Sequence, residues 1–99
     1  MSIKNCVSLD EVREEIDKLD EKIVELIAKR SHYVRQAAKF KHSIEKIKEE
    51  SRLDDIMSRV RQKAIQENIS PNMLEDIYRL MIEEMVETEV AEFQNRNSL

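Results

Sequence analysis

Hydrophobic positions recur at helical spacing along almost the whole chain. The first stripe advances in alternating steps of four and three residues, through Val12, Ile16, Leu19, Ile23, Leu26, Arg30, Tyr33, Ala37, Phe40 and Ile44. Such a heptad pattern is typical of a long helix that packs against another helix. Because no helix-breaking residue occurs before about Lys48, the pattern predicts a first helix of about 35 to 40 residues, roughly 55 Å long.

Polar residues mark the start of this helix. Ser8 and Glu11 have the spacing of a capping box, in which the two side chains accept hydrogen bonds from backbone N–H groups of the first turn. Val7 and Val12 have the spacing of a hydrophobic staple, in which apolar side chains before and after the N-cap pack together. We therefore expect the helix to begin directly after Ser8.

A second helix is predicted to follow an interruption of the first. We expect that interruption within Ile44–Glu50, and Ser51 is a suitable N-cap for the helix that follows. The apolar residues of this second helix again keep helical spacing: Leu53, Ile56, Met57, Val60 and Ala64.

The clearest turn of the chain lies just before Pro71. Asn68 can adopt the left-handed conformation that ends a helix, Ser70 can cap the next one, and proline is favoured at the first helical position. A third helix is therefore predicted to begin at Pro71 and to extend to about Phe93. The last residues, 94–99, are predicted to form a fraying tail.

Composition restricts the fold class. The chain has 99 residues with no glycine, one proline and 4% aromatic residues, whereas sheets and tight hairpins depend on glycine and aromatic side chains. We expect an all-α fold, a single helical domain over residues 1–99. A compact chain of this length is only about 35 Å across, so the predicted first helix would extend beyond a monomer.

The charge of the chain and the composition of its segments restrict the kinds of partner that we expect. The net charge of −4 argues against a nucleic-acid partner, which usually requires a basic excess. No apolar run is long enough to span a membrane, and the N-terminal residues lack the apolar core of a signal peptide, so we expect a cytoplasmic protein. His32 and His42 are ten positions apart, unsuited to a metal pair on one helix face, and no bound metal is expected.

Cations occupy unexpected positions on the first stripe. Arg30 stands on the heptad stripe itself, and Lys41, eleven residues later, would lie about 20° from the same helix face. Together they could bind a small dianion. Arg13 would lie roughly 25 Å from Arg30 along the same helix. Only an antiparallel partner helix could therefore bring an Arg13 close to Arg30. The alternative is that these residues form internal salt bridges or a solvated surface.

An acidic residue stands among apolar neighbours in the third helix. Glu89 is flanked at helical spacing by Met85, Val86, Val90 and Phe93. A carboxyl group in such surroundings is either paired with a cation or protonated, and a protonated one could donate a hydrogen bond. A plain salt bridge to Arg30 or Lys41 is the alternative.

Together these residues resemble the all-helical chorismate mutases, including the related isochorismate-pyruvate lyases. The resemblance covers nearly the whole chain. It rests on Arg13 with the Ile16-Asp17 and Asp20 that follow it, on Arg30 and Lys41 with ten residues between them, and on the tract Tyr33–Lys41. This tract, with Cys6 before the helix, is more similar to the lyases than to the mutases.

The resemblance implies an intertwined homodimer of three-helix subunits, with active sites shared between the chains and no cofactor. Arg30 and Lys41 of one subunit and Arg13 of the other would hold the two carboxylates of chorismate or isochorismate. Arg52 would be a further substrate-binding arginine. Glu89 would lie beside the ether oxygen of the substrate, with Lys41 as the other catalytic residue.

Three functions are therefore compatible with the sequence. The first is a chorismate mutase, which rearranges chorismate to prephenate in aromatic amino acid biosynthesis. The second is an isochorismate-pyruvate lyase, which releases salicylate and pyruvate. The third is a non-catalytic helical dimerisation module, which needs only the heptad pattern. Leu53 and Met85 stand where the family often has polar residues that bind the ring hydroxyl of the substrate.

Overall fold

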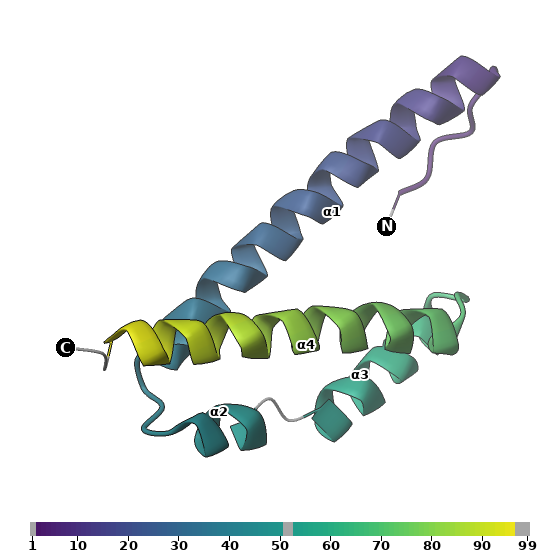
Figure 1. Cartoon of the computed structure of the whole chain (residues 1–99). Helices are drawn as coiled ribbons and strands as arrows, with labels where there is room; N and C mark the ends of the chain where they lie inside the picture. Colours follow the sequence, from purple (N-terminus) through teal and green to yellow (C-terminus); the bar gives the residue numbers. More distant parts are fainter. Residues whose placement is uncertain (1, 51–52, 97–99) are drawn as a thin grey trace. The chain divides into compact units, whose positions relative to one another are not determined.

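The chain is described by a computed structural model that covers residues 2–50 and 53–96, and within these ranges all regular structure is helical. Four helices follow one another: α1 (Leu9–Ala38), α2 (Ile44–Glu50), α3 (Leu53–Gln66) and α4 (Pro71–Arg96) (Figure 1). The predicted all-α fold is confirmed. The three expected helices correspond to α1, α3 and α4, and the short α2 is additional.

The chain divides into two compact units, and the boundary falls within α1, after His32. The first unit, Met1–His32, consists of the N-terminal segment and most of α1. The second unit, Tyr33–Leu99, contains the end of α1 together with α2, α3 and α4.

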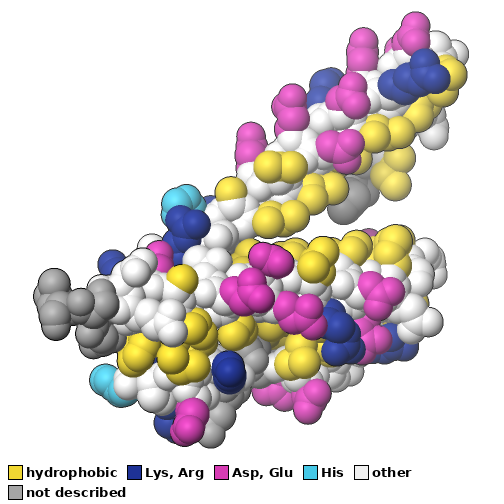
Figure 2. Space-filling view, viewed as in Figure 1, with side chains coloured by type: hydrophobic (Ala, Val, Ile, Leu, Met, Phe, Trp, Pro, Cys, Tyr) yellow, Lys and Arg dark blue, Asp and Glu magenta, His cyan; other side chains and the backbone are white. Residues whose placement is uncertain are grey.

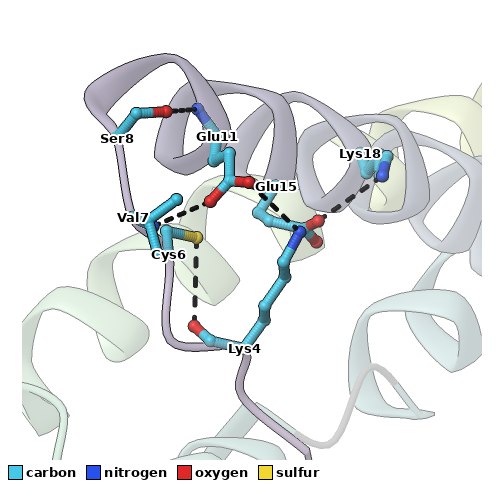
Figure 3. Close-up of polar contacts among 7 residues, drawn as sticks. All are labelled: Lys4, Cys6, Val7, Ser8, Glu11, Glu15 and Lys18. Atoms are coloured by element: carbon cyan, nitrogen blue, oxygen red, sulfur yellow. Dashed lines mark hydrogen bonds and ion pairs between the residues drawn. The ribbon is translucent and has the colours of Figure 1, made fainter.

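The predicted helix start at Ser8 is confirmed. The backbone N–H of Glu11 donates to Ser8 Oγ at 3.1 Å, and the Glu11 carboxylate accepts from the backbone N–H of Val7 at 2.7 Å (Figure 3). Lys4 adds an ion pair to the same carboxylate at 3.9 Å. The Ser8 side chain thus satisfies the N–H of Glu11, one of the groups that a helix start leaves without an intrahelical partner. The Glu11 carboxylate lies at the end of the helix where the helix dipole stabilises negative charge.

In the first unit, α1 leaves its apolar stripe open. Figure 2 shows hydrophobic side chains along one side of α1 and acidic side chains along the opposite edge. The stripe residues are between 40% and 64% exposed: Val12, Ile16, Leu19, Ile23 and Leu26. Within this unit, the sequence pattern that predicts packing against another helix therefore has no helix to cover it.

Helix α1 ends earlier than its sequence pattern predicts. It has 30 residues and stops at Ala38, so the expected continuation to about Lys48 is wrong. Two features end it. The last turn tightens, with the N–H of Lys41 donating to the carbonyl of Ala38 at 3.3 Å. The Arg96 side chain then donates to the carbonyls of both residues, at 3.2 Å and 3.3 Å.

The segment predicted as an interruption is itself helical. Residues 44–50 form α2, and Ser43 caps its start by accepting a hydrogen bond from the N–H of Lys46 at 3.1 Å. The break in the chain therefore lies at residues 39–43 rather than at 44–50. The predicted cap at Ser51 lies outside the described residues.

The core of the second unit forms around α4, against which both α2 and α3 pack (Figure 1). Ile47 of α2 is completely buried. The other buried apolar residues come from the end of α1, from α3 and from α4: Ala38, Met57, Ala64 and Ile82. Burial of these side chains fixes α2 and the end of α1 near the second half of the chain.

The turn between α3 and α4 is confirmed as predicted. Asn68 has a left-handed backbone (φ 59°), and the N–H of Ile69 donates to the carbonyl of Ala64 at 3.0 Å, which closes the end of α3. Ser70 caps α4 by accepting from the N–H of Met73 at 3.1 Å, and α4 begins at Pro71. Both ends of the turn are thus set by local sequence.

Helix α4 continues to Arg96, so the expectation of a fraying tail from residue 94 is wrong for 94–96; residues 97–99 lie outside the described part of the chain. None of the helices in the described ranges combines the length and the apolar character of a membrane span.

Candidate functional site

The second unit contains a buried ion pair between Lys41 and Glu89. Lys41 Nζ donates to Glu89 Oε2 at 2.7 Å, and the two residues are only 8% and 5% exposed. Lys41 lies in the turn after α1, and Glu89 lies on α4. Two sequence-predicted catalytic residues are thus brought together by the fold.

Glu89 was expected either to pair with a cation or to be protonated, and the structure shows the pairing with Lys41. A buried carboxylate is costly unless a positive charge and hydrogen bonds compensate it. The described residues contain no buried side-chain nitrogen or oxygen without a hydrogen-bond partner. The ammonium group has three donors, and its bond to Glu89 uses one of them, so the pair can also serve an acceptor on a ligand.

Lys41 does not lie on the same helix as Arg30, contrary to the prediction from their spacing of eleven residues. The sequence argument placed it on the same helix as Arg30, eleven residues further along one face. Because α1 ends at Ala38, Lys41 is not on that helix, and helical phase does not determine where its side chain points. Its position depends instead on the turn at residues 39–41 and on the contact with α4.

Three backbone hydrogen bonds shape this turn. The N–H groups of Lys39, Phe40 and Lys41 each donate to the carbonyl three residues before, at 3.2, 3.0 and 3.3 Å. Phe40, which the heptad pattern assigned to the packing stripe, is 78% exposed. Phe40 therefore does not pack into the core of the second unit.

The other predicted site residues do not belong to the described part of the second unit. Arg13 and Arg30 both belong to the first compact unit, where Arg13 is exposed and Arg30 is partly buried. Arg52 lies outside the described residues. The structure therefore joins Lys41 and Glu89, while the roles of the three arginines remain predictions.

Arg96 was missed by the sequence analysis. Its guanidinium contacts the backbone of the Lys41 turn and lies over the Phe93 ring, 5.5 Å from the ring centre. A position near the chain end gave no reason to expect such contacts. The only local signal is the spacing of three residues between Phe93 and Arg96, which places them on one helix face.

The resemblance noted in the sequence puts polar residues at two positions that are apolar in this chain. Met85 is partly buried on α4, one turn before Glu89. Leu53 is partly buried as the first residue of α3. Neither side chain can accept a hydrogen bond from a hydroxyl group in the way a carboxylate or hydroxyl would.

Among the residues that the structure describes, no group of three or more histidine, cysteine or acidic side chains is arranged to hold a metal ion. The charged groups described at this site are the Lys41 ammonium, the Glu89 carboxylate and the Arg96 guanidinium, which bonds to backbone carbonyls. Their chemistry is that of hydrogen bonding and charge stabilisation.

The chain is similar to known proteins over most of its length. The sequence model of the family described as chorismate mutase type II matches residues 12–90. A chorismate mutase from Methanocaldococcus jannaschii is 30% identical over 93 residues, which cover 90% of this chain and 94% of that protein. The matched range includes Arg13, Arg30, Lys41, Arg52 and Glu89.

Proposed function

Since this chain belongs to the chorismate mutase type II family, we propose that it rearranges chorismate to prephenate. The observation that carries the proposal is the buried Lys41–Glu89 pair, at 2.7 Å. This rearrangement is concerted: the ether C–O bond breaks while a C–C bond forms between the enolpyruvyl group and the ring. It needs hydrogen-bond donors and a fixed substrate conformation.

Lys41 is suited to the developing charge. As the ether bond breaks, negative charge grows on its oxygen, and an ammonium group held in place there stabilises the transition state more than the ground state. In a buried setting this interaction is stronger than in water. The ion pair with Glu89 supports the role because it fixes the direction of the Lys41 ammonium group.

The role of Glu89 depends on whether its carboxyl group is ionised or protonated. As an anion, it orients Lys41. When protonated, it can donate its own hydrogen bond to the ether oxygen, which an ionised carboxylate cannot do. We propose that the anion orients Lys41 in the protein without substrate, as in the ion pair, and that in the complex the protonated form donates to the ether oxygen.

Arg13, Arg30 and Arg52 complete the proposal as carboxylate-binding residues. Chorismate has two carboxylates, and arginine binds such groups through two parallel hydrogen bonds. Holding both carboxylates would fold the flexible enolpyruvyl group over the ring, which lowers the entropic part of the barrier. The similarity to the family supports these assignments.

We also propose that the protein acts as a homodimer in which Arg13 comes from the partner subunit. Two observations support this. The apolar stripe of α1 is at least 40% exposed in the single chain, and α1, with 30 residues, is roughly 45 Å long, which exceeds the diameter of a compact chain of this size. A second copy of α1 would cover the stripe.

The proposed domain is a single one over residues 1–99. The family match supports this, because residues 12–90 extend across both compact units.

The direct test is to offer the purified protein chorismate and isochorismate separately and to identify the products by NMR. We expect prephenate from chorismate. Lys63, an exposed lysine of α3 paired with Glu67, is a matched control: Lys63→Ala should retain full activity, whereas Lys41→Ala should lose most of it. Salicylate from isochorismate alone would assign the chain to the lyases, and no product from either compound would contradict the proposal.

A further inference from the structure

Lys41 is held from two sides by one helix. Its side chain bonds to Glu89, and its backbone carbonyl accepts from Arg96 at 3.3 Å. Glu89 and Arg96 are seven residues apart on α4, which is about two helical turns and brings them to nearly the same face. Residues on one face of α4 therefore bind both the side chain and the backbone carbonyl of Lys41.

The Arg96 guanidinium spans the turn that presents Lys41. One of its terminal nitrogens donates to the carbonyl of Ala38 and the other to the carbonyl of Lys41. The Ala38 carbonyl also accepts the N–H of Lys41, so these three groups form a closed set of hydrogen bonds. A planar fork with fixed donor directions sets the separation of the two carbonyls, and an ammonium group cannot do so.

Two further features favour this position for an arginine. The last carbonyls of a helix have no partners within the helix and carry partial negative charge, which a cation stabilises. The Phe93 ring beneath the guanidinium limits its orientation. The ring contact thus restricts the guanidinium group that bonds to the turn.

We infer that Arg96 is a positioning residue for catalysis: it fixes the backbone of the turn so that the Lys41 ammonium points to its reactive position. This inference rests on the proposed function, in which Lys41 stabilises the ether oxygen. Arg96 itself bonds to backbone carbonyls and acts only through Lys41. Small displacements of such a group have large effects on rate, because its hydrogen bond is strongest in the transition state.

The test compares Arg96→Gln and Arg96→Lys with two controls. Glu92→Gln removes the Arg35–Glu92 ion pair (3.9 Å), which also joins the end of α1 to α4 but does not touch the turn carbonyls. Arg79→Gln removes another α4 arginine, which is paired with Glu75. Both controls should keep the wild-type kcat and KM.

We expect Arg96→Gln to lower kcat on chorismate by about tenfold while KM changes less than about twofold, because the loss falls on the transition state. Arg96→Lys, which keeps the charge but can bond only one carbonyl well, should recover part of kcat. A kcat within about twofold of wild type for Arg96→Gln in an active enzyme would overturn the inference. An equal loss in Glu92→Gln would also overturn it, because general docking of α1 would then be the cause.

A second measurement does not depend on activity. Amide hydrogen exchange at Lys41 should become about tenfold faster in Arg96→Gln than in wild type, since hydrogen bonds to charged groups resist local opening. It should stay unchanged in Glu92→Gln. A wild-type protein without mutase activity would contradict the proposed function, and unchanged exchange at Lys41 would show that Arg96 does not hold the turn.

Discussion

Lys41 and Glu89, which are 48 positions apart in the chain, form an ion pair at 2.7 Å with only 9% and 7% of their side chains exposed. Each charge compensates the loss of hydration of the other. The pair therefore links the chemistry of the site to the stability of the second unit, because replacing either residue by an apolar one leaves its partner as a buried, unpaired charge.

Removing one partner should destabilise the protein more than removing both. Lys41→Met leaves the Glu89 carboxylate unpaired and should lower the free energy of unfolding by about 3 kcal/mol, whereas Lys41→Met with Glu89→Leu should recover most of that loss. Urea unfolding at one fixed protein concentration measures both. Lys63→Met, which breaks the exposed Lys63–Glu67 pair, should cost no more than about 1 kcal/mol. Additive effects of the two buried changes would contradict this prediction.

Lys41 should contribute to turnover more than to substrate affinity. In Lys41→Ala, at a temperature where circular dichroism shows a folded protein, kcat should fall about 100-fold and KM much less, as for other donors to a developing charge. Lys41→Arg should not restore full activity, because a planar fork does not replace a single point donor. A rise in KM with kcat unchanged would assign Lys41 to substrate binding.

Glu89→Gln should change the pH dependence of the reaction. If only the protonated carboxyl group assists, wild-type turnover should rise as the pH is lowered. Glutamine has a permanent N–H donor of nearly the same shape, so the variant should show a flatter profile and higher turnover at neutral and alkaline pH. Turnover of both proteins on chorismate, measured between about pH 5 and 9, gives the two profiles. Identical profiles, or a variant inactive at every pH, would show that Glu89 acts as an anion.

Elements with local signals were predictable from the sequence. The capping box at Ser8 and the turn with Asn68, Ser70 and Pro71 were placed correctly, because each depends on residues within a few positions of one another. The end of α1 was not. The heptad pattern continues through Phe40, and the contact that helps to stop the helix comes from Arg96, far away in sequence. Ser43, which caps α2, was a local signal that could have been recognised.

The candidate site was predictable to a similar extent. Glu89 stood out because apolar residues surround it at helical spacing, and its pairing with Lys41 was among the alternatives. The geometric argument for Lys41 failed, because it assumed that the helix continued past Ala38. Arg96 was not found, because its contacts with backbone carbonyls leave no pattern in a sequence and its spacing from Phe93 indicates only a shared helix face.

Mixed dimers should show whether two chains share a site. Arg13→Ala and Arg30→Ala should each be inactive alone. After unfolding and refolding together in equal amounts, half of the dimers should contain one site with both arginines, giving about a quarter of the wild-type activity. Arg30→Ala mixed with Lys41→Ala is the control and should recover nothing, because those residues are proposed to serve a site from the same chain. Absence of recovery in the first mixture would contradict the shared site.

Asn68 should determine the stability of the turn between α3 and α4. Its left-handed backbone (φ 59°) is unfavourable for residues with a Cβ other than asparagine and aspartate, so Asn68→Ala should cost about 1 kcal/mol of unfolding free energy. Asn68→Gly should be neutral or stabilising. Gln66→Ala, at the exposed end of α3, should change stability by less than about 0.5 kcal/mol. An Asn68→Ala variant as stable as wild type would contradict the role of this conformation.

The spacing of seven residues between Glu89 and Arg96 also limits how the length of α4 can change. Inserting or deleting one residue between them rotates Arg96 by about 100° around the helix and moves it away from the carbonyls of Ala38 and Lys41. Most exposed side chains in this stretch can be replaced without such an effect. For anyone engineering this protein, residues 90–95 therefore form a segment whose length must be kept although much of its surface composition is open to change.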